Sequence, residues 1–212
     1  MPFNLPNTIT SVRVALAPIV ALLLLGPSLH SRLLAFLVFV LAGLSDLWDG
    51  QLARRRGQIT NFGKLVDPIA DKLLVVATLL PLYWIGLVRP EVLPIPMYGG
   101  LPLWVLFVLL GREVIVTTLR LAAARRGSVV PASPVGKRKA LAQNIFVGSA
   151  ILLVALQTGA RANGWSGSFW GGFQLVHEWF TSLSLTVALA LTIVSLVTYL
   201  TAFSHIFAGQ EP

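Results

Sequence analysis

The sequence predicts an all-α fold: a polytopic membrane bundle of six transmembrane helices with a short amino-terminal interfacial segment. Of the 212 residues, 56% are hydrophobic and only 11% are charged, whereas soluble domains carry about 25% charged residues. Apolar runs long enough to span a bilayer, about 20 residues each, recur along the whole chain. We therefore expect residues 1–212 to form a single integral membrane domain.

Turn residues and charged residues separate the apolar runs. A Pro- and Gly-rich stretch at 91–100 follows the third run, and a Gly/Ser/Trp-rich loop is expected at 163–172. Residues 4–10 are expected to lie at the membrane interface, with Asn7 or Thr8 capping the first helix. The six spans are predicted at residues 9–27, 31–54, 65–88, 101–124, 138–158 and 180–207.

The distribution of basic residues predicts the orientation, because cytoplasmic loops carry an excess of Lys and Arg. One set of loops carries only Arg32, Arg89 and Arg161. The opposite set carries Arg54, Arg55, Arg56, Lys64, Arg125, Arg126, Lys137, Arg138 and Lys139. We expect both termini and this basic side to face the cytoplasm. The net charge of +8 comes without a nucleic-acid-binding motif, so we expect no nucleic-acid partner; the lipid bilayer is the expected surroundings.

Four of the eight acidic residues lie in one window at the seam between two apolar runs. Asp46 and Asp49 are three positions apart and Asp67 and Asp71 four, so each pair lies on one face if its segment is helical. Carboxylates at membrane depth are costly and indicate a functional site. The chain has no cysteine, so a metal would bind to oxygen or imidazole ligands. The window therefore favours a pair of divalent cations, Mg²⁺ or Mn²⁺.

Small and basic residues inside the window suggest a diphosphate site. Gly50 and Ala53 lie on the same side as the first aspartate pair, and Arg54 supplies a cation suited to phosphate oxygens. Asp71 is our candidate for the general base that deprotonates an attacking hydroxyl. An interfacial salt-bridge cluster of the aspartates with neighbouring Lys and Arg residues is the alternative interpretation.

The full spacing of the window, D-x-x-D-G-x-x-A-R-x8-G-x-x-x-D-x-x-x-D, resembles the signature of the CDP-alcohol phosphatidyltransferase family. All eight signature positions match: Asp46, Asp49, Gly50, Ala53, Arg54, Gly63, Asp67 and Asp71. The resemblance implies transfer of a phosphatidyl group from CDP-diacylglycerol to an alcohol, with release of CMP, by an enzyme that tends to form homodimers. It implies that the four aspartates bind two metals and that Asp71 is also the base. The residues expected to contact CDP-diacylglycerol are Gly50, Ala53, Arg54, Thr60, Gly63, Asn7 and Thr10.

Two further stretches indicate the acceptor alcohol. Arg112 and Arg120 lie within the fourth apolar run, and Lys137 and Lys139 open the fifth. Both stretches are similar to those of the bacterial phosphatidylglycerophosphate synthases, a branch of the family, so we expect these four residues to bind the phosphate of glycerol 3-phosphate. The alternatives are pairing of the arginines with Glu113 and anchoring of the lysines at the cytoplasmic surface.

Other functions remain open at this point. Within the family, phosphatidylglycerol or an inositol phosphate could replace glycerol 3-phosphate as acceptor, giving a cardiolipin synthase or a phosphatidylinositol phosphate synthase. From another class, a cation transporter could use membrane-embedded aspartates, but transporters often show repeated halves, and the sequence has no internal repeat.

Overall fold

The computed structural model describes the backbone of residues 5–56, 61–125 and 133–207 and the side chains of residues 11–45, 72–125 and 133–204. These residues form six long α-helices and one short 3₁₀ helix, and the described part of the chain contains no strand. The prediction of an all-α fold with six helices is confirmed. The elements are α1 (Leu5–Leu25), α2 (Leu29–Arg56), α3 (Asn61–Val88), η1 (Pro90–Val92), α4 (Leu103–Arg125), α5 (Pro134–Asn163) and α6 (Ser168–Phe207).

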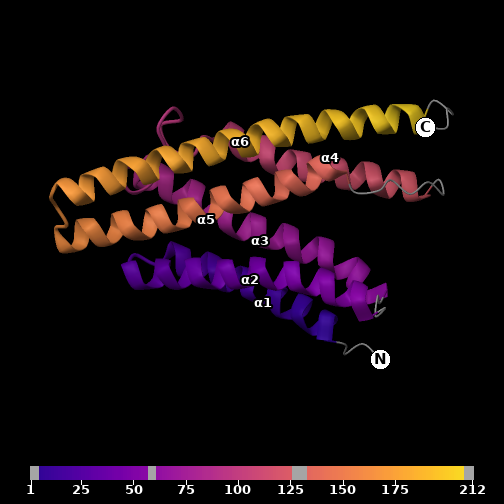
Figure 1. Ribbon diagram of the computed structural model, residues 1–212, viewed down its shortest axis with the longest axis horizontal. Helices are drawn as coiled ribbons and strands as arrows, with labels where there is room; N and C mark the ends of the chain where they lie inside the picture. The colour runs from indigo at the N-terminus through magenta and orange to yellow at the C-terminus, as the bar shows by residue number, and fades with distance from the viewer. Residues whose placement is uncertain (1–4, 57–60, 126–132, 208–212) are drawn as a thin grey trace.

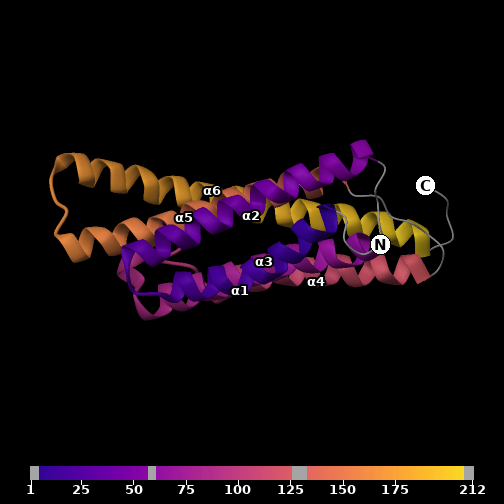
Figure 2. The same cartoon turned by 90° about the horizontal axis from the view of Figure 1, so that it is seen from below.

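The helices form two groups of three. In the first group α1 packs against both α2 and α3, and in the second α6 packs against both α4 and α5. Contacts between α2 and α5, with smaller contacts from α3 to α4 and α5, join the groups. In Figure 1 the second group lies above the first. The helices run up and down the long axis, so α1 begins and α6 ends at the same end of the bundle (Figure 2).

The core lies between the two groups and is built from apolar side chains of α1 to α6. Leu24, Leu82, Leu109, Phe146 and Leu185 are among its fully or almost fully buried members. Large apolar side chains also cover the outside of the bundle: Phe107, Val176 and Leu22 are each about 70% exposed. An exposed apolar surface of this extent is unusual for a soluble monomer and fits a lipid environment.

By length and composition, two of the described helices can cross a membrane: Pro134–Asn163 and Ser168–Ser204. Shorter apolar segments of 10–17 residues lie in α1, α2 and α3.

Some helix ends differ from the sequence prediction. Because α1 begins at Leu5, Asn7 and Thr8 lie inside the helix and neither can cap it; the interfacial placement of residues 4–10 stays a prediction. The expected loop at 163–172 is wrong in its length, since α5 continues to Asn163 and α6 begins at Ser168. Gly164 ends α5 in a left-handed conformation, with φ 62°, and its backbone N–H donates to the carbonyl of Ala160.

The start of α5 has a clear sequence cause. Ser133 is the N-cap, and its Oγ accepts a hydrogen bond from the backbone N–H of Gly136 at 3.0 Å. Pro134 follows at the first helical position, where its missing N–H costs nothing. This cap fixes the point at which Lys137 and Lys139 enter the helix.

Candidate active site

A cavity of about 170 Å³ lies where α1 to α5 meet, between the two helix groups. Its polar lining comes from four helices: Arg13 on α1, Lys72 and Thr78 on α3, Glu113 on α4, and Lys139, Gln143 and Asn144 on α5. Three of these side chains are cations and one is a carboxylate, so the described part of the lining carries a net positive charge. A cavity with this balance of charges suits an anionic ligand.

The cavity lies next to the acidic window along two helices. Gly43 on α2 lines it and comes three positions before Asp46, and Lys72 on α3 lines it and directly follows Asp71. Both aspartate pairs belong to helical segments, because α2 continues to Arg56 and α3 begins at Asn61. The helical spacing predicted for each pair is therefore confirmed at the level of the backbone. Pro68 lies inside α3, so Asp67 is not a helix cap.

The side chains of the four aspartates lie outside the described residues, so their metal-binding and base roles stay predictions. The same holds for every residue expected to contact CDP-diacylglycerol: Gly50, Ala53, Arg54, Thr60, Gly63, Asn7 and Thr10. Among the side chains that the structure does describe, no three His, Cys, Asp or Glu residues gather as a metal site.

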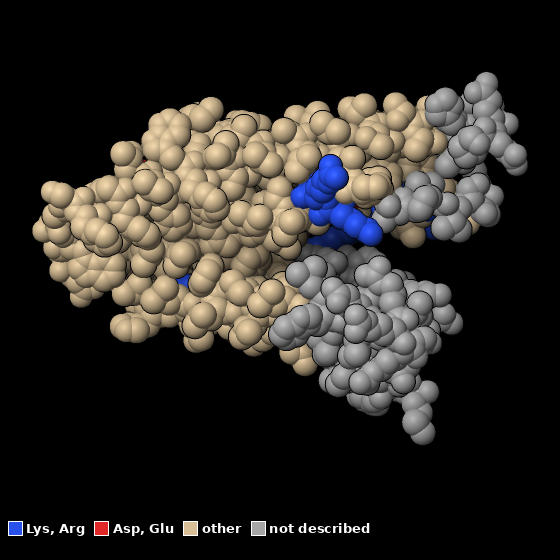
Figure 3. Space-filling view, in the orientation of Figure 1, with Lys and Arg blue, Asp and Glu red and all other residues tan. Residues whose placement is uncertain are grey.

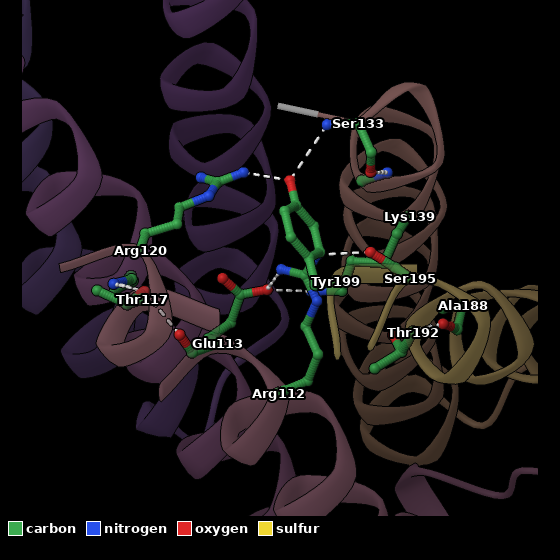
Figure 4. Close-up of polar contacts among 12 residues, drawn as sticks. Arg112, Glu113, Thr117, Arg120, Ser133, Lys139, Ala188, Thr192, Ser195 and Tyr199 are labelled. Atoms are coloured by element: carbon green, nitrogen blue, oxygen red, sulfur yellow. Dashed lines mark hydrogen bonds and ion pairs between the residues drawn. The ribbon is translucent and has the colours of Figure 1, made fainter. Parts of the chain in front are cut away.

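Glu113 joins two buried cations beside the cavity. Its Oε1 accepts hydrogen bonds from Lys139 Nζ at 2.5 Å and from Arg112 Nη1 at 3.0 Å (Figure 4). Lys139 is only 3% exposed and Arg112 only 8% exposed. Buried charges are tolerated when they are paired and hydrogen-bonded, and here one carboxylate serves two cations. The group retains a net positive charge.

Lys72 of α3 is connected to this group through Thr117. Its Nζ donates a hydrogen bond to Thr117 Oγ1, and Thr117 Oγ1 donates to the backbone carbonyl of Glu113 at 2.7 Å. The ammonium group directly after Asp71 in sequence is thereby held against α4. Nothing in the periodicity of the sequence distinguished Lys72 from other basic residues near the membrane surface.

Arg112 and Arg120 meet at Tyr199 of α6. The guanidinium carbon of Arg112 lies 5.4 Å from the Tyr199 ring centroid and that of Arg120 lies 4.9 Å from it. Arg120 donates to the Tyr199 hydroxyl, which also accepts from the backbone N–H of Ser133 at 3.1 Å (Figure 4). Arg112 Nη2 donates to Ser195 Oγ at 2.6 Å. The two arginines thus come together around an aromatic ring.

The four residues expected to bind the acceptor phosphate therefore have different surroundings. Lys139 lines the cavity. Arg112 instead donates a hydrogen bond to Glu113, and Arg120 donates one to the hydroxyl of Tyr199. Lys137 is exposed near the start of α5. On the face shown in Figure 3, the largest cluster of Lys and Arg side chains lies near the middle of the molecule, and smaller basic spots are visible elsewhere. The alternative interpretation, pairing of an arginine with Glu113, is present for Arg112 and does not exclude a role in binding.

Ser195 and Tyr199 were missed by sequence reasoning. They lie in α6, 83 and 79 positions from the arginines that they contact. In the sequence they are isolated polar residues in a long apolar run, which is the usual pattern of a membrane helix. Only the packing of α6 against α4 shows that they belong to this network.

Comparison with known proteins agrees with the signature. The model of the CDP-alcohol phosphatidyltransferase family matches residues 3–203. The CDP-diacylglycerol–glycerol-3-phosphate 3-phosphatidyltransferase of Bacillus subtilis is 38% identical over 205 residues, which cover 91% of each chain. A probable phosphatidylglycerophosphate synthase of Mycobacterium tuberculosis is 43% identical over 152 residues, or 70% of this chain and 66% of that protein.

A third relative carries a different name. The CMP-forming cardiolipin synthase of Streptomyces coelicolor is 33% identical over 176 residues, which cover 79% of this chain and 75% of that protein. All three relatives align over most of the chain, and the family model spans nearly all of it. On this evidence the chain belongs to the CDP-alcohol phosphatidyltransferase family, and it is an enzyme that transfers a phosphatidyl group.

Proposed function

We propose that the protein transfers the phosphatidyl group of CDP-diacylglycerol to glycerol 3-phosphate, giving phosphatidylglycerophosphate and CMP. The observation that carries this proposal is the cation-lined cavity directly beside the signature segments of α2 and α3. An acceptor that itself bears a phosphate needs cations close to the diphosphate site. The names of the Bacillus and Mycobacterium relatives support the same acceptor.

In the proposed reaction, one residue takes up the proton and a separate group of residues binds the acceptor phosphate. In the proposed mechanism Asp71 takes the proton from the attacking hydroxyl of glycerol 3-phosphate. The new O–P bond forms at the β-phosphorus of CDP-diacylglycerol, and the bond from that phosphorus to the oxygen of CMP breaks. Lys139 and Lys72 hold the acceptor phosphate, and Glu113 keeps Lys139 in place through the 2.5 Å contact.

The donor set fits the divalent cations that enzymes of this family use. Carboxylate oxygens are the ligands that Mg²⁺ and Mn²⁺ prefer, and both aspartate pairs belong to helices, α2 and α3, that also contribute to the cavity lining. We assign two metal ions to Asp46, Asp49, Asp67 and Asp71. When bound, the ions neutralise the charge of the diphosphate and of the departing CMP.

The proposal includes the placement in the membrane. All six helices would span the inner membrane of a bacterium, with both termini and the cavity on the cytoplasmic side, as the basic loops favour. The acyl chains of CDP-diacylglycerol would stay in the bilayer, and the two headgroups would meet at the cavity. A homodimer is part of the proposal by family resemblance.

An acceptor assay tests the proposed function. Purified protein in detergent micelles receives CDP-diacylglycerol, Mg²⁺ or Mn²⁺, and one radiolabelled acceptor: glycerol 3-phosphate, phosphatidylglycerol or inositol phosphate. We expect CMP release and a labelled lipid with glycerol 3-phosphate alone. The Streptomyces relative makes cardiolipin synthesis the second candidate, and formation of cardiolipin from phosphatidylglycerol in this assay would replace our proposal with it.

The Asp71→Asn substitution tests the base. The amide keeps the size of the side chain but cannot accept the proton, so we expect turnover to fall about 1,000-fold or more, within the usual range for loss of a general base. Binding of CDP-diacylglycerol, measured by equilibrium titration, should weaken only modestly. Wild-type turnover in this variant would exclude Asp71 as the base while leaving the acceptor assignment intact.

A further inference from the structure

Gln143 is a buried amide at the cavity with an unsatisfied oxygen. It lies on α5, four positions after Lys139, and its side chain is 2% exposed and lines the cavity. Its Oε1 has no hydrogen-bond partner. Buried polar atoms in proteins are nearly always hydrogen-bonded, so an unpaired one needs an explanation.

A second buried glutamine on the same helix shows the ordinary situation. Gln157 is 3% exposed, and its Nε2 donates to Glu178 Oε1 at 3.1 Å. Gln157 does not line the cavity. Gln157 is thus hydrogen-bonded within the protein through its Nε2, whereas the Oε1 of Gln143 is buried at the cavity without a partner. The unpaired oxygen at the cavity indicates that Gln143 receives its partner from the ligand.

The position of Gln143 indicates which part of a ligand it contacts. Residues four apart on a helix share a face and lie about 5–6 Å apart, so one small molecule can contact both Gln143 and Lys139. Lys139 is a cation and suits the phosphate end of such a molecule, whereas a neutral amide suits a hydroxyl. A hydroxyl both donates and accepts, so it satisfies the amide in either of its two orientations.

We propose that Gln143 binds the middle, non-reacting hydroxyl of the glycerol 3-phosphate acceptor and thereby makes the enzyme select a vicinal diol. This inference rests on the proposed function. Glycerol 3-phosphate offers a phosphate for the cations, a terminal hydroxyl that attacks phosphorus, and one hydroxyl between them. That middle hydroxyl has no role in bond formation, and Gln143 is an uncharged, buried group of the described lining whose side-chain oxygen has no hydrogen-bond partner.

The experiment removes the hydroxyl from the substrate and the amide from the protein. The probe is 3-hydroxypropyl phosphate, which keeps the phosphate and the reacting hydroxyl but lacks the middle one. Values of kcat/KM for glycerol 3-phosphate and for this analogue are measured with the wild type and with Gln143→Met, which has similar length and no amide. We expect the wild type to prefer glycerol 3-phosphate roughly 10–100-fold, because a site built to bond a hydroxyl rejects an analogue without it.

In Gln143→Met the ratio of kcat/KM for glycerol 3-phosphate to kcat/KM for the analogue should fall to about threefold or less. The fall should come from a lower kcat/KM for glycerol 3-phosphate, with the KM for CDP-diacylglycerol unchanged. Gln143→Leu gives the same comparison with a smaller side chain if methionine disturbs folding. Gln157→Met is the matched control: it removes a buried amide from the same helix away from the cavity, and it should keep the wild-type preference. A ratio in Gln143→Met equal to that of the wild type, or a wild type without any preference, overturns the inference.

Failure of the proposed function has a different signature. In that case the wild type makes no phosphatidylglycerophosphate from glycerol 3-phosphate, which is visible before any variant is used. A wild type that uses glycerol 3-phosphate and a Gln143→Met variant that discriminates as well as the wild type leave the proposed function in place and remove the inference alone.

Discussion

Two buried arginines at different places in the bundle differ in their hydrogen-bond partners. Arg112 on α4 is 8% exposed and Arg32 on α2 is 3% exposed, and each donates a hydrogen bond to a hydroxyl on a neighbouring helix, Ser195 and Thr158 respectively. Arg112 also pairs with Glu113, whose carboxylate holds Lys139 at the cavity. Arg32 instead donates through Nε to the carbonyl of Gly26 at 3.0 Å.

The two arginines show that a buried charge beside the cavity and a buried charge away from it can have different roles. Gly26 follows the last residue of α1, where helix carbonyls lack partners within the helix. Arg32 supplies a donor to that end and ties it to α5, so its role is structural. Arg112 and Lys139, both buried, share the single carboxylate of Glu113 beside a cavity. A buried ionisable residue is thus a candidate for function when it lies beside a cavity that a ligand can enter. A buried ionisable residue that only pairs with other groups of the protein, as Arg32 does, is a candidate for a structural role.

The largest effect that follows from this contrast is expected for Lys139→Met. The variant removes one of the cations that line the cavity, while Glu113 keeps Arg112 as a partner. A hydrogen bond to a charged group contributes about 1.5–3 kcal/mol, so kcat/KM for glycerol 3-phosphate should fall about 10–100-fold. Initial rates of CMP release measure it. Arg138→Met, which removes an exposed cation next to Lys139, is the control and should change the value by less than about threefold.

The next effect concerns stability. Arg32→Met removes the donor to Gly26 and Thr158, and we expect a loss of about 2 kcal/mol in the free energy of unfolding. Thermal unfolding of the purified protein in detergent should show a lower midpoint, and turnover per folded molecule should match the wild type. Lost turnover at unchanged stability would place Arg32 in the active machinery and remove the contrast between the two arginines.

The smallest effect is expected for Tyr199→Phe. The phenylalanine ring can still lie against Arg112 and Arg120, but the hydroxyl that accepts from Arg120 and from the Ser133 N–H is lost. The cap at the start of α5 then loses one support, and we expect the KM for glycerol 3-phosphate to rise about 3–5-fold, corresponding to about 1 kcal/mol, with kcat nearly unchanged.

Tyr98→Phe is the matched control for Tyr199→Phe. The Tyr98 hydroxyl pairs with Thr186 Oγ1 at 2.9 Å, in the connection between α3 and α4. Its loss should leave the KM for glycerol 3-phosphate unchanged. Equal KM values for the two variants and the wild type would show that the hydroxyl of Tyr199 does not position the acceptor site.

Sequence reasoning succeeded where the physical cause is local. Apolar runs and turn residues predicted six helices, and the three- and four-residue spacings of the aspartates predicted helical segments that the structure contains. The start of α6 was placed too late because the sequence from Ser168 onward is rich in Gly and aromatic residues, which resemble a loop when read alone. Contacts such as Trp165 with Trp170, with ring centroids 5.2 Å apart, order this region.

Sequence reasoning was incomplete where contacts join distant parts of the chain. It placed Arg112, Arg120 and Lys139 in one group, but the spacing of Arg112 and Arg120 on α4 cannot show that a tyrosine of α6 lies between them and the start of α5. Gln143 was not singled out from the sequence, because its importance depends on burial and on an unpaired atom. Both properties arise only when five helices enclose the cavity.

The length of α6 has a consequence for the depth of the enzyme in a bilayer. A helix of 40 residues is about 60 Å long, about twice the thickness of the hydrocarbon layer, so under the proposed placement α6 would tilt or project beyond the lipid tails. Its first turns and the preceding connection carry Trp165, Trp170 and Phe173, and tryptophan prefers the headgroup level. If these rings fix the far end at one leaflet, a thicker or thinner membrane changes the tilt of α6 and, with it, the height at which the cavity meets the headgroups of its lipid substrate.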